Sequence, residues 1–138
     1  MRVTPKYIKD LKENEIFVFG SNREGRHGKG SALTARQKFG AIYGQSEGLQ
    51  GQSYAIITKE LRKSHEPVTL NEIKIGVDKF IKFSIDNPNL IFYVVELGCN
   101  LAYFKVEEIA PIFKEAFKLK NVYLPQGFID QLQRGISI

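Results

Sequence analysis

Short apolar runs and segments of helical spacing alternate along the first half of the chain. Residues 16–19 (Ile-Phe-Val-Phe) form an apolar run bounded by Gly20, a pattern typical of a buried strand. Helix-forming residues follow at positions 31–39, and Gly40 suits the position just after a helix end. Residues 53–58 (Ser-Tyr-Ala-Ile-Ile-Thr) predict a second strand. This half therefore predicts a strand, a helix and a strand, in that order.

The second half continues the alternation and ends on a strand. Thr69, with Glu72 three residues later, matches a helix capping box, in which each side chain bonds to the backbone N–H of the other residue. Apolar residues at helical spacing follow and predict a helix to about Asp86. Residues 90–95 are apolar on both faces and are predicted as a central strand. The remaining predicted elements are a helix at residues 106–117 and a strand at residues 121–124 that ends at Pro125.

This order of elements predicts an α/β fold. Strands that alternate with helices build a mixed, mostly parallel sheet with helices on both of its faces. With 138 residues, the chain lies within the usual size of one domain. We therefore predict a single domain over residues 1–138. Residues 1–15 and 126–138 are expected to add a peripheral strand or a short helix.

The composition is that of a protein with an ordinary core and no covalent cross-link. Apolar residues make up 43% of the chain and charged residues 25%. The single cysteine excludes an internal disulfide. The first residues lack the apolar segment of a secretory signal, and no apolar run approaches the ~20 residues that span a bilayer. A cytoplasmic protein without a membrane partner is expected.

The net charge of +5 favours anionic partners, but the lysines and arginines are spread along the whole chain. A nucleic-acid surface combines basic residues with exposed aromatic residues on one face. The sequence does not show such a pattern. Nucleic acid is therefore not expected as a partner, and nucleic-acid binding ranks last among the hypotheses.

The loop after the first strand carries most of the chemical signal. Most of the twelve glycines lie in the stretch that begins at Gly20. Gly25, Gly28 and Gly30 permit positive φ and close approach, so that successive backbone N–H groups can converge on one oxygen. The loop leads into a helix that begins near Gly30 or Ser31, and a helix N-terminus offers unpaired donors and partial positive charge. The loop therefore predicts an anion site. The alternative is a wide turn that needs glycine only for its geometry.

Two known phosphate motifs do not fit this loop. A Walker A loop requires Ser or Thr directly after Gly-Lys, whereas Gly30 follows Lys29 here and the serine comes one position late. The glycine spacing also differs from that of the dinucleotide fingerprint. In a parallel sheet, however, ligands bind outside the carboxyl ends of the strands. The loops at residues 59–60 and 97–104 should therefore meet the glycine-rich loop at one edge.

Metal binding is not predicted, and no cofactor is expected. His27, His65 and Cys99 are the soft-ligand candidates, and no two of them have the spacing of a metal site. We expect His27 to donate a hydrogen bond to a ligand or to the backbone. His65 is expected to be a solvated loop residue, and Cys99 a small buried residue behind its loop.

An apolar strand is followed by the polar pair Ser21-Asn22, by residues 28–32 (Gly-Lys-Gly-Ser-Ala) at a helix start and later by residues 97–102 (Leu-Gly-Cys-Asn-Leu-Ala). Together these features resemble the macrodomain superfamily, over about residues 16–124. The resemblance implies a three-layer macrodomain-like fold that binds ADP-ribose, with one glycine-rich loop on the diphosphate and a second loop closing over it. It also implies a contact of Asn22 with the distal ribose or its surroundings. The ligand-binding residues predicted from the loops and the resemblance are Gly20, Ser21, Asn22, His27, Gly28, Gly30, Ser31 and Ala32, followed by Gly98, Cys99, Asn100, Leu101, Ala102 and Phe104.

Within the superfamily, the chain is most similar to the terminal ADP-ribose glycohydrolase class and to small macro-like proteins of bacteria and their phages. Residues 54–59 (Tyr-Ala-Ile-Ile-Thr-Lys) resemble the strand that delivers the catalytic lysine of that class. The resemblance makes Lys59 the nucleophile toward the anomeric carbon. That class has an aspartate after its Gly-Cys-Gly-Leu motif, where this chain has Ala102, and Asn100 replaces the second glycine. The acid that completes turnover is missing from its expected place.

Two functions follow from this comparison. The first is binding of ADP-ribose or a related NAD-derived nucleotide. The alternative is an ADP-ribosyl hydrolase that removes ADP-ribose from protein carboxylates with Lys59, so that the partner would be an ADP-ribosylated protein. Glu60 and Glu96 are acids close to the predicted site in the sequence. Glu60 is expected to point away from Lys59, because neighbouring side chains of a strand face opposite sides.

Overall fold

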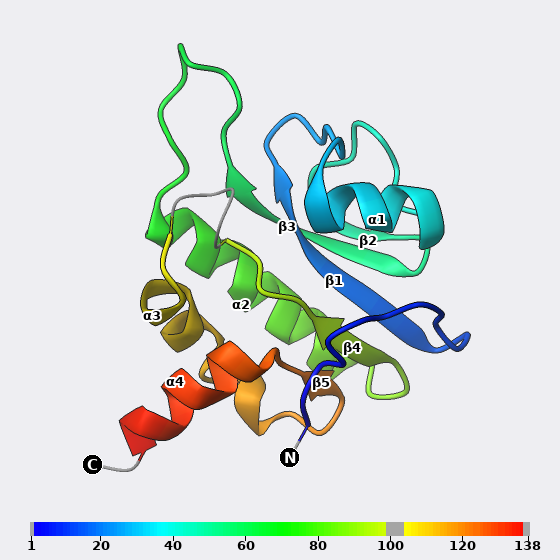
Figure 1. Cartoon of the computed structure of the whole chain (residues 1–138), viewed down its shortest axis with the longest axis vertical. Coiled ribbons are helices and arrows are strands. Elements are labelled where there is room, and N and C mark those ends of the chain that lie inside the picture. The colour runs from blue at the N-terminus through cyan, green and yellow to red at the C-terminus, as the bar shows by residue number, and fades with distance from the viewer. Residues whose placement is uncertain (1, 99–103, 137–138) are drawn as a thin grey trace.

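Strand β1 (Glu15–Asn22) occupies the middle of a five-stranded sheet. The computed structural model describes residues 2–98 and 104–136. Figure 1 shows the sheet crossing the molecule between its helices. The other elements are α1 (Gly30–Lys38), β2 (Gly48–Gln50), β3 (Ser53–Lys59), α2 (Leu70–Asp86), β4 (Ile91–Val94), α3 (Val106–Ile109), β5 (Val122–Tyr123) and α4 (Gln126–Ile136), with 3₁₀ segments η2 (Ala110–Phe113) and η3 (Ala116–Lys118).

The sheet is mixed and mostly parallel, as the alternation of strands and helices predicted. Its order is β2-β3-β1-β4-β5. Strand β1 pairs in parallel with β3 and β4, and β4 pairs in parallel with β5. The short strand β2 was not predicted, and it pairs antiparallel with β3. Strand β4 lies inside the sheet as expected of its apolar sequence, but the middle position belongs to β1.

Alternating side chains of β1 separate two hydrophobic cores and so create three layers. Phe17 and Phe19 face α1, where they pack with Ala35 and other small or aromatic residues. Ile16 and Val18 face the opposite side, where α2, η2 and α4 supply the larger core. This alternation is the two-residue period of a strand. Figure 1 shows α1 on one side of the sheet and α2, α3 and α4 on the other. The predicted α/β class with helices on both faces is therefore confirmed.

Helix α2 begins at the predicted capping box. Glu72 N donates to Thr69 Oγ1 at 3.2 Å, and Thr69 N donates to Glu72 Oε1 at 3.4 Å. These bonds satisfy backbone donors that a helix leaves unpaired in its first turn. The helix ends at Asp86, as its apolar spacing predicted.

The predicted helix at residues 106–117 is wrong as one continuous α-helix. The α-helical part ends at Ile109, and two 3₁₀ segments follow. Pro111 lies within the break, and it lacks the N–H that a continuing helix requires. The apolar face is nevertheless kept, because Ile109, Phe113 and Ala116 are fully buried.

The N-terminal segment pairs with the residue that follows the last strand. Val3 forms a parallel bridge with Leu124, and Thr4 N donates to Leu124 O at 2.8 Å. The predicted short helix beyond the last strand is present as α4. Among the described residues, no helix has the length and apolar character needed to cross a membrane.

Gly20 lets the ends of three strands come together. A Cβ at Gly20 would lie 3.0 Å from Thr58 Oγ1 and 3.2 Å from Leu97 Cβ. Thr58 belongs to β3, and Leu97 follows β4. The absence of a side chain on β1 therefore lets the segments from its two neighbours close over it.

We predict that Gly20→Ala destabilises the protein, because the added methyl group must displace Thr58 or Leu97. Overpacking of this kind typically costs about 1–3 kcal/mol in the free energy of unfolding. Gly28→Ala is the matched control, since no atom lies within 4 Å of a Cβ at Gly28 and its φ is not positive. Urea denaturation of both variants measures the effect. Equal stabilities would contradict the prediction.

Candidate functional site

A cleft of about 700 Å³ lies at the carboxyl edge of the parallel strands. Its wall combines the glycine-rich loop after β1 with the ends of β3 and β4, the three segments that sequence reasoning expected to meet there. The lining residues are Gly20, Ser21, Asn22, Arg26, Gly28, Lys29, Gly30, Ser31, Ala32, Tyr43, Thr58, Lys59, Leu61, Val95, Glu96, Leu97 and Gly98.

The side chain of Asn22 holds the start of the glycine-rich loop. Asn22 Nδ2 donates to Arg26 O, and Arg26 N donates to Asn22 Oδ1, both at 2.8 Å. Between these residues, Gly25 has φ of +68°, and a Cβ there would lie 2.6 Å from the backbone of Gly44. Asn22 lines the cleft as predicted, but both of its side-chain polar atoms already bond to Arg26. Its demonstrated role is therefore to position the loop.

The N-terminus of α1 faces the cleft without an internal cap. Gly28, Gly30 and Ser31 line the cleft at this helix start, and Gly30 has φ of +58°. Lys29, the N-cap residue, makes no side-chain capping bond, and the first turn contains no acidic residue. The first N–H groups of a helix lack intrahelical acceptors and carry partial positive charge. This helix start can therefore bind an anion.

A charged network joins the glycine-rich loop to the segment after β3 and to the start of α2. Arg23 Nη2 lies 2.7 and 2.8 Å from the two carboxylate oxygens of Glu72, and Nη1 lies 3.1 Å from Glu60 Oε1. Arg62 Nη2 donates to the same Glu60 oxygen at 2.9 Å. Hydrogen bonds from Arg62, together with that from Arg23, hold the pKa of Glu60 far below its usual range, although desolvation opposes this shift. The predicted direction of Glu60, away from Lys59, agrees with these contacts.

Lys59 stands at the end of β3, in the cleft, where the resemblance expected it. It lies opposite Asn22 in the β1–β3 pairing, and its carbonyl accepts from Arg23 N at 3.1 Å. The preceding residue, Thr58, is buried, and its hydroxyl donates to Ser21 O at 3.3 Å. Lys59 and the glycine-rich loop therefore share one site.

His27 does not line the cleft, contrary to its assignment as a ligand-binding residue. Its side chain is fully buried beneath the loop, edge-on to Phe19 with ring centroids 5.2 Å apart. Its Nε2 lies 3.3 Å from Ser21 Oγ, within hydrogen-bond reach, while Nδ1 has no hydrogen-bond partner among the described residues. Burial and the charge of Arg36 lower the pKa of His27, with a smaller opposing contribution from the backbone of Gln45. The ring supports the loop from below.

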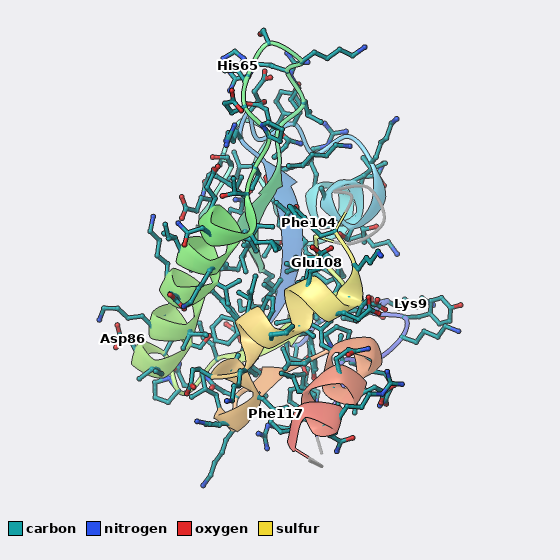
Figure 2. The ribbon with its side chains drawn as sticks, turned by 90° about the vertical axis from the view of Figure 1, so that its left-hand side faces the viewer. Lys9, His65, Asp86, Phe104, Glu108 and Phe117 are labelled. Carbon is teal, nitrogen blue, oxygen red and sulfur yellow. The ribbon has the colours of Figure 1, made fainter. Side chains whose placement is uncertain are left out.

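The second glycine loop is described only at its two ends. Gly98 lines the cleft with φ of +79°, and a Cβ there would lie 2.9 Å from Ile109 Cδ1. Phe104 N donates to Gly98 O at 3.3 Å, which closes the loop, and the Phe104 side chain packs against the larger core and is absent from the cleft lining. Figure 2 labels Phe104 just before α3. The predicted residues Cys99, Asn100, Leu101 and Ala102 lie outside the described residues.

Sequence reasoning missed about half of the cleft wall. Arg26 and Lys29 could have been assigned, because they lie within the glycine-rich loop itself. Tyr43 and Leu61 come from other loops, and no local pattern shows that these reach the cleft. The further lining residues that were not assigned are Thr58, Val95, Glu96 and Leu97.

The described residues contain no group of three His, Cys, Asp or Glu side chains that could hold a metal ion. No family model and no curated protein sequence matches the chain. Among solved structures, a protein of unknown function from Bacteroides thetaiotaomicron aligns with a TM-score of 0.60 and 19% identity, over 85% of this chain and 90% of that one. A macrodomain protein from Streptomyces coelicolor aligns with a TM-score of 0.57 and 13% identity, over 86% and 92%. The chain therefore has a macrodomain-like fold, as the resemblance implied.

Because burial lowers the pKa of His27, acid should destabilise the protein through this residue. Below about pH 6.5 the unfolded chain binds a proton on this side chain. The folded chain does not bind it until the pH reaches the lowered pKa. The free energy of unfolding therefore falls as the pH drops through this window, by at most about 1.4 kcal/mol per pH unit for one proton.

Denaturation at pH 7.5 and pH 5.5 measures this dependence. His27→Gln should lose part of the pH dependence, while His65→Gln should keep it, since His65 is exposed at the tip of the projecting segment in Figure 2. If His27→Gln keeps the wild-type dependence of stability on pH, the loss of stability in acid does not come from His27.

Proposed function

We propose that the cleft binds ADP-ribose or a related NAD-derived nucleotide. The observation that carries the proposal is the uncapped N-terminus of α1, which opens onto a cleft of about 700 Å³ in a macrodomain-like fold. A volume of that size is typical of sites for small organic ligands. The sequence resemblance points to the same ligand class.

The part of the cleft near α1 supports binding of a diphosphate. Backbone N–H groups at Gly30 and Ser31 adjoin the positive end of the helix, whereas the Gly28 N–H already donates to Arg26 O at 3.0 Å. Arg26, Lys29 and Lys59 add cationic side chains to the same wall. Gly28 needs glycine neither for packing nor for a positive φ, because a Cβ there would meet open space. Its lack of a side chain keeps this stretch of backbone accessible to a phosphate group.

Apolar side chains support binding of the flat and weakly polar parts of a nucleotide. Tyr43 and Leu61 line the cleft although they are 58% and 41% exposed. Val95 and Leu97 provide a further apolar surface beside β4. Aromatic and aliphatic walls with a few placed polar groups are the usual lining of ligand sites. A nucleoside linked to a diphosphate matches this division of the cleft.

Isothermal titration with ADP-ribose tests this function. The wild-type protein should bind with micromolar or tighter affinity. Gly28→Val should weaken binding at least about tenfold, a loss of about 1.4 kcal/mol, because its side chain would occupy cleft space beside the helix start that receives the phosphate. Gly76→Ala in α2 is the matched control and should bind as the wild type does. Absence of wild-type binding to ADP-ribose and to ADP would overturn the proposal.

Hydrolysis of protein-linked ADP-ribose is the second candidate, and the position of Lys59 in the cleft favours it. In this reaction the neutral Lys59 amine would attack the anomeric carbon and release the protein carboxylate. Water would then cleave the lysine adduct, which regenerates the amine and yields free ADP-ribose. Binding remains the first proposal, because the acid expected at the position of Ala102 is absent from the sequence.

Incubation with glutamate-ADP-ribosylated protein tests the second candidate. If the protein is a hydrolase, the wild type releases ADP-ribose and Lys59→Ala abolishes the release. Lys114→Ala, which removes an exposed lysine distant in the fold, should leave the rate unchanged. Release by Lys59→Ala at the wild-type rate would exclude Lys59 chemistry, and no release by the wild type would exclude hydrolysis of this linkage.

A further inference from the structure

Glu96 is the single acidic residue among the described residues that line the cleft. Its side chain is exposed, and no described residue forms a hydrogen bond or an ion pair with it. The other acids near the cleft differ in this respect, because Glu60 and Glu72 bind Arg23, and Glu24 pairs with Arg26. The carboxylate of Glu96 is thus available to a ligand.

Glu96 lies on the β4 side of the cleft. It follows β4 and rests against the first turn of α4, where a Cβ at Gly127 would be 3.4 Å from Glu96 Oε1. Lys59 ends β3, and β1 separates β3 from β4 in the sheet. Two strand spacings amount to about 10 Å. The carboxylate and the amine therefore mark different sides of the cleft.

Electrostatics restricts what Glu96 can contact. A carboxylate accepts hydrogen bonds but donates none while ionised, and it repels a diphosphate. The cationic side chains and the helix N-terminus that suit the diphosphate come from the loop after β1 and from β3. The ligand groups that fit Glu96 are neutral donors, namely the hydroxyl groups of a ribose or the amine of a base.

We propose that Glu96 accepts hydrogen bonds from the nucleoside end of the ligand and thereby fixes its direction in the cleft. This inference rests on the proposed function. The nucleoside lies on the β4 side, the diphosphate crosses at the start of α1, and the far end of the ligand points to Lys59. Glu96 then selects nucleotides over simple phosphates.

The sign of the change in affinity tests this role. If Glu96 is only a wall of the cleft, Glu96→Ala removes a repulsive charge and tightens binding of every anion. If it accepts from the nucleoside, Glu96→Ala weakens ADP-ribose about tenfold or more, as expected for loss of a charged acceptor, while pyrophosphate binds equally well or more tightly. Glu96→Gln keeps one acceptor oxygen and should weaken ADP-ribose less than Glu96→Ala does.

Titration calorimetry with ADP-ribose and pyrophosphate measures these effects. Glu13→Ala is the charge-matched control, because Glu13 is exposed just before β1, at the opposite edge of the sheet. Thermal unfolding of each variant confirms folding. ADP-ribose binding to Glu96→Ala that equals or exceeds wild-type binding overturns the inference alone. Failure of the wild type to bind ADP-ribose overturns the proposed function and the inference with it.

Two analogues identify the donor group. Inosine diphosphate ribose lacks the base amine, so if Glu96 accepts from that amine, the analogue binds the wild type weakly and is indifferent to Glu96→Ala. ADP-ribose with a phosphate on the adenosine 2′-oxygen lacks that hydroxyl. If Glu96 accepts from the hydroxyl, the wild type rejects this analogue and Glu96→Ala binds it better. Insensitivity to both changes, and to removal of the adenosine 3′-hydroxyl in the 3′-deoxy analogue, contradicts a nucleoside contact at Glu96.

Discussion

The close packing of three strand ends around Gly20 is the constraint on which the cleft depends. Thr58 and the segment that begins at Leu97 approach β1 so closely that a methyl group at Gly20 would touch both. The same Thr58 hydroxyl bonds to the carbonyl of Ser21. The strand ends at the carboxyl edge are therefore packed against one another, and the loops that follow them begin at fixed positions. A site built from three separate loops needs such a rigid base to keep its geometry.

The glycine-rich loop is held in place by contacts on two sides. Its conformation therefore does not depend on side chains that would occupy the cleft. Below it, His27 fills the space next to Phe19 and Ser21. Beside it, Arg23 joins the loop to Glu60 and to the start of α2. Ionised Glu60 is central to this second anchor, and its lowered pKa follows from its arginine partners. These supports lie outside the cleft, and the start of α1 remains uncapped where it faces the cleft.

The features that the sequence predicted correctly are those encoded by neighbouring residues. The apolar run of β1 and the capping box of α2 require only local patterns. Strand β2 has no apolar run, and it exists because it pairs with β3 while Gln50 Oε1 accepts from Ile42 N at 2.7 Å. The break after Ile109 could have been anticipated from Pro111. The apolar periodicity of residues 106–117 nevertheless favoured a continuous helix, because buried 3₁₀ turns present a similar apolar face.

In the cleft, too, features encoded by local sequence were predictable and features set by tertiary contacts were not. The glycines were assignable because their conformational freedom belongs to the residue itself. The burial of His27 was not predictable, because a polar ring within a polar loop gives no local sign that the fold will bury it. Glu96 was noticed only as a nearby acid. Its exposure and its lack of a partner among the described residues depend on where β4 ends and on the first turn of α4.

The arrangement of charges favours recognition over turnover. A lysine nucleophile needs a neighbouring group to take up and return protons. Glu60, the acid next to Lys59 in the chain, is held ionised by two arginines, and Glu96 lies across β1. Among the described lining residues, the cleft therefore has cationic side chains and backbone donors on one side and a single acidic side chain on the other. Under the proposed function, this polarity matches the anionic middle and the neutral, donor-bearing nucleoside end of ADP-ribose.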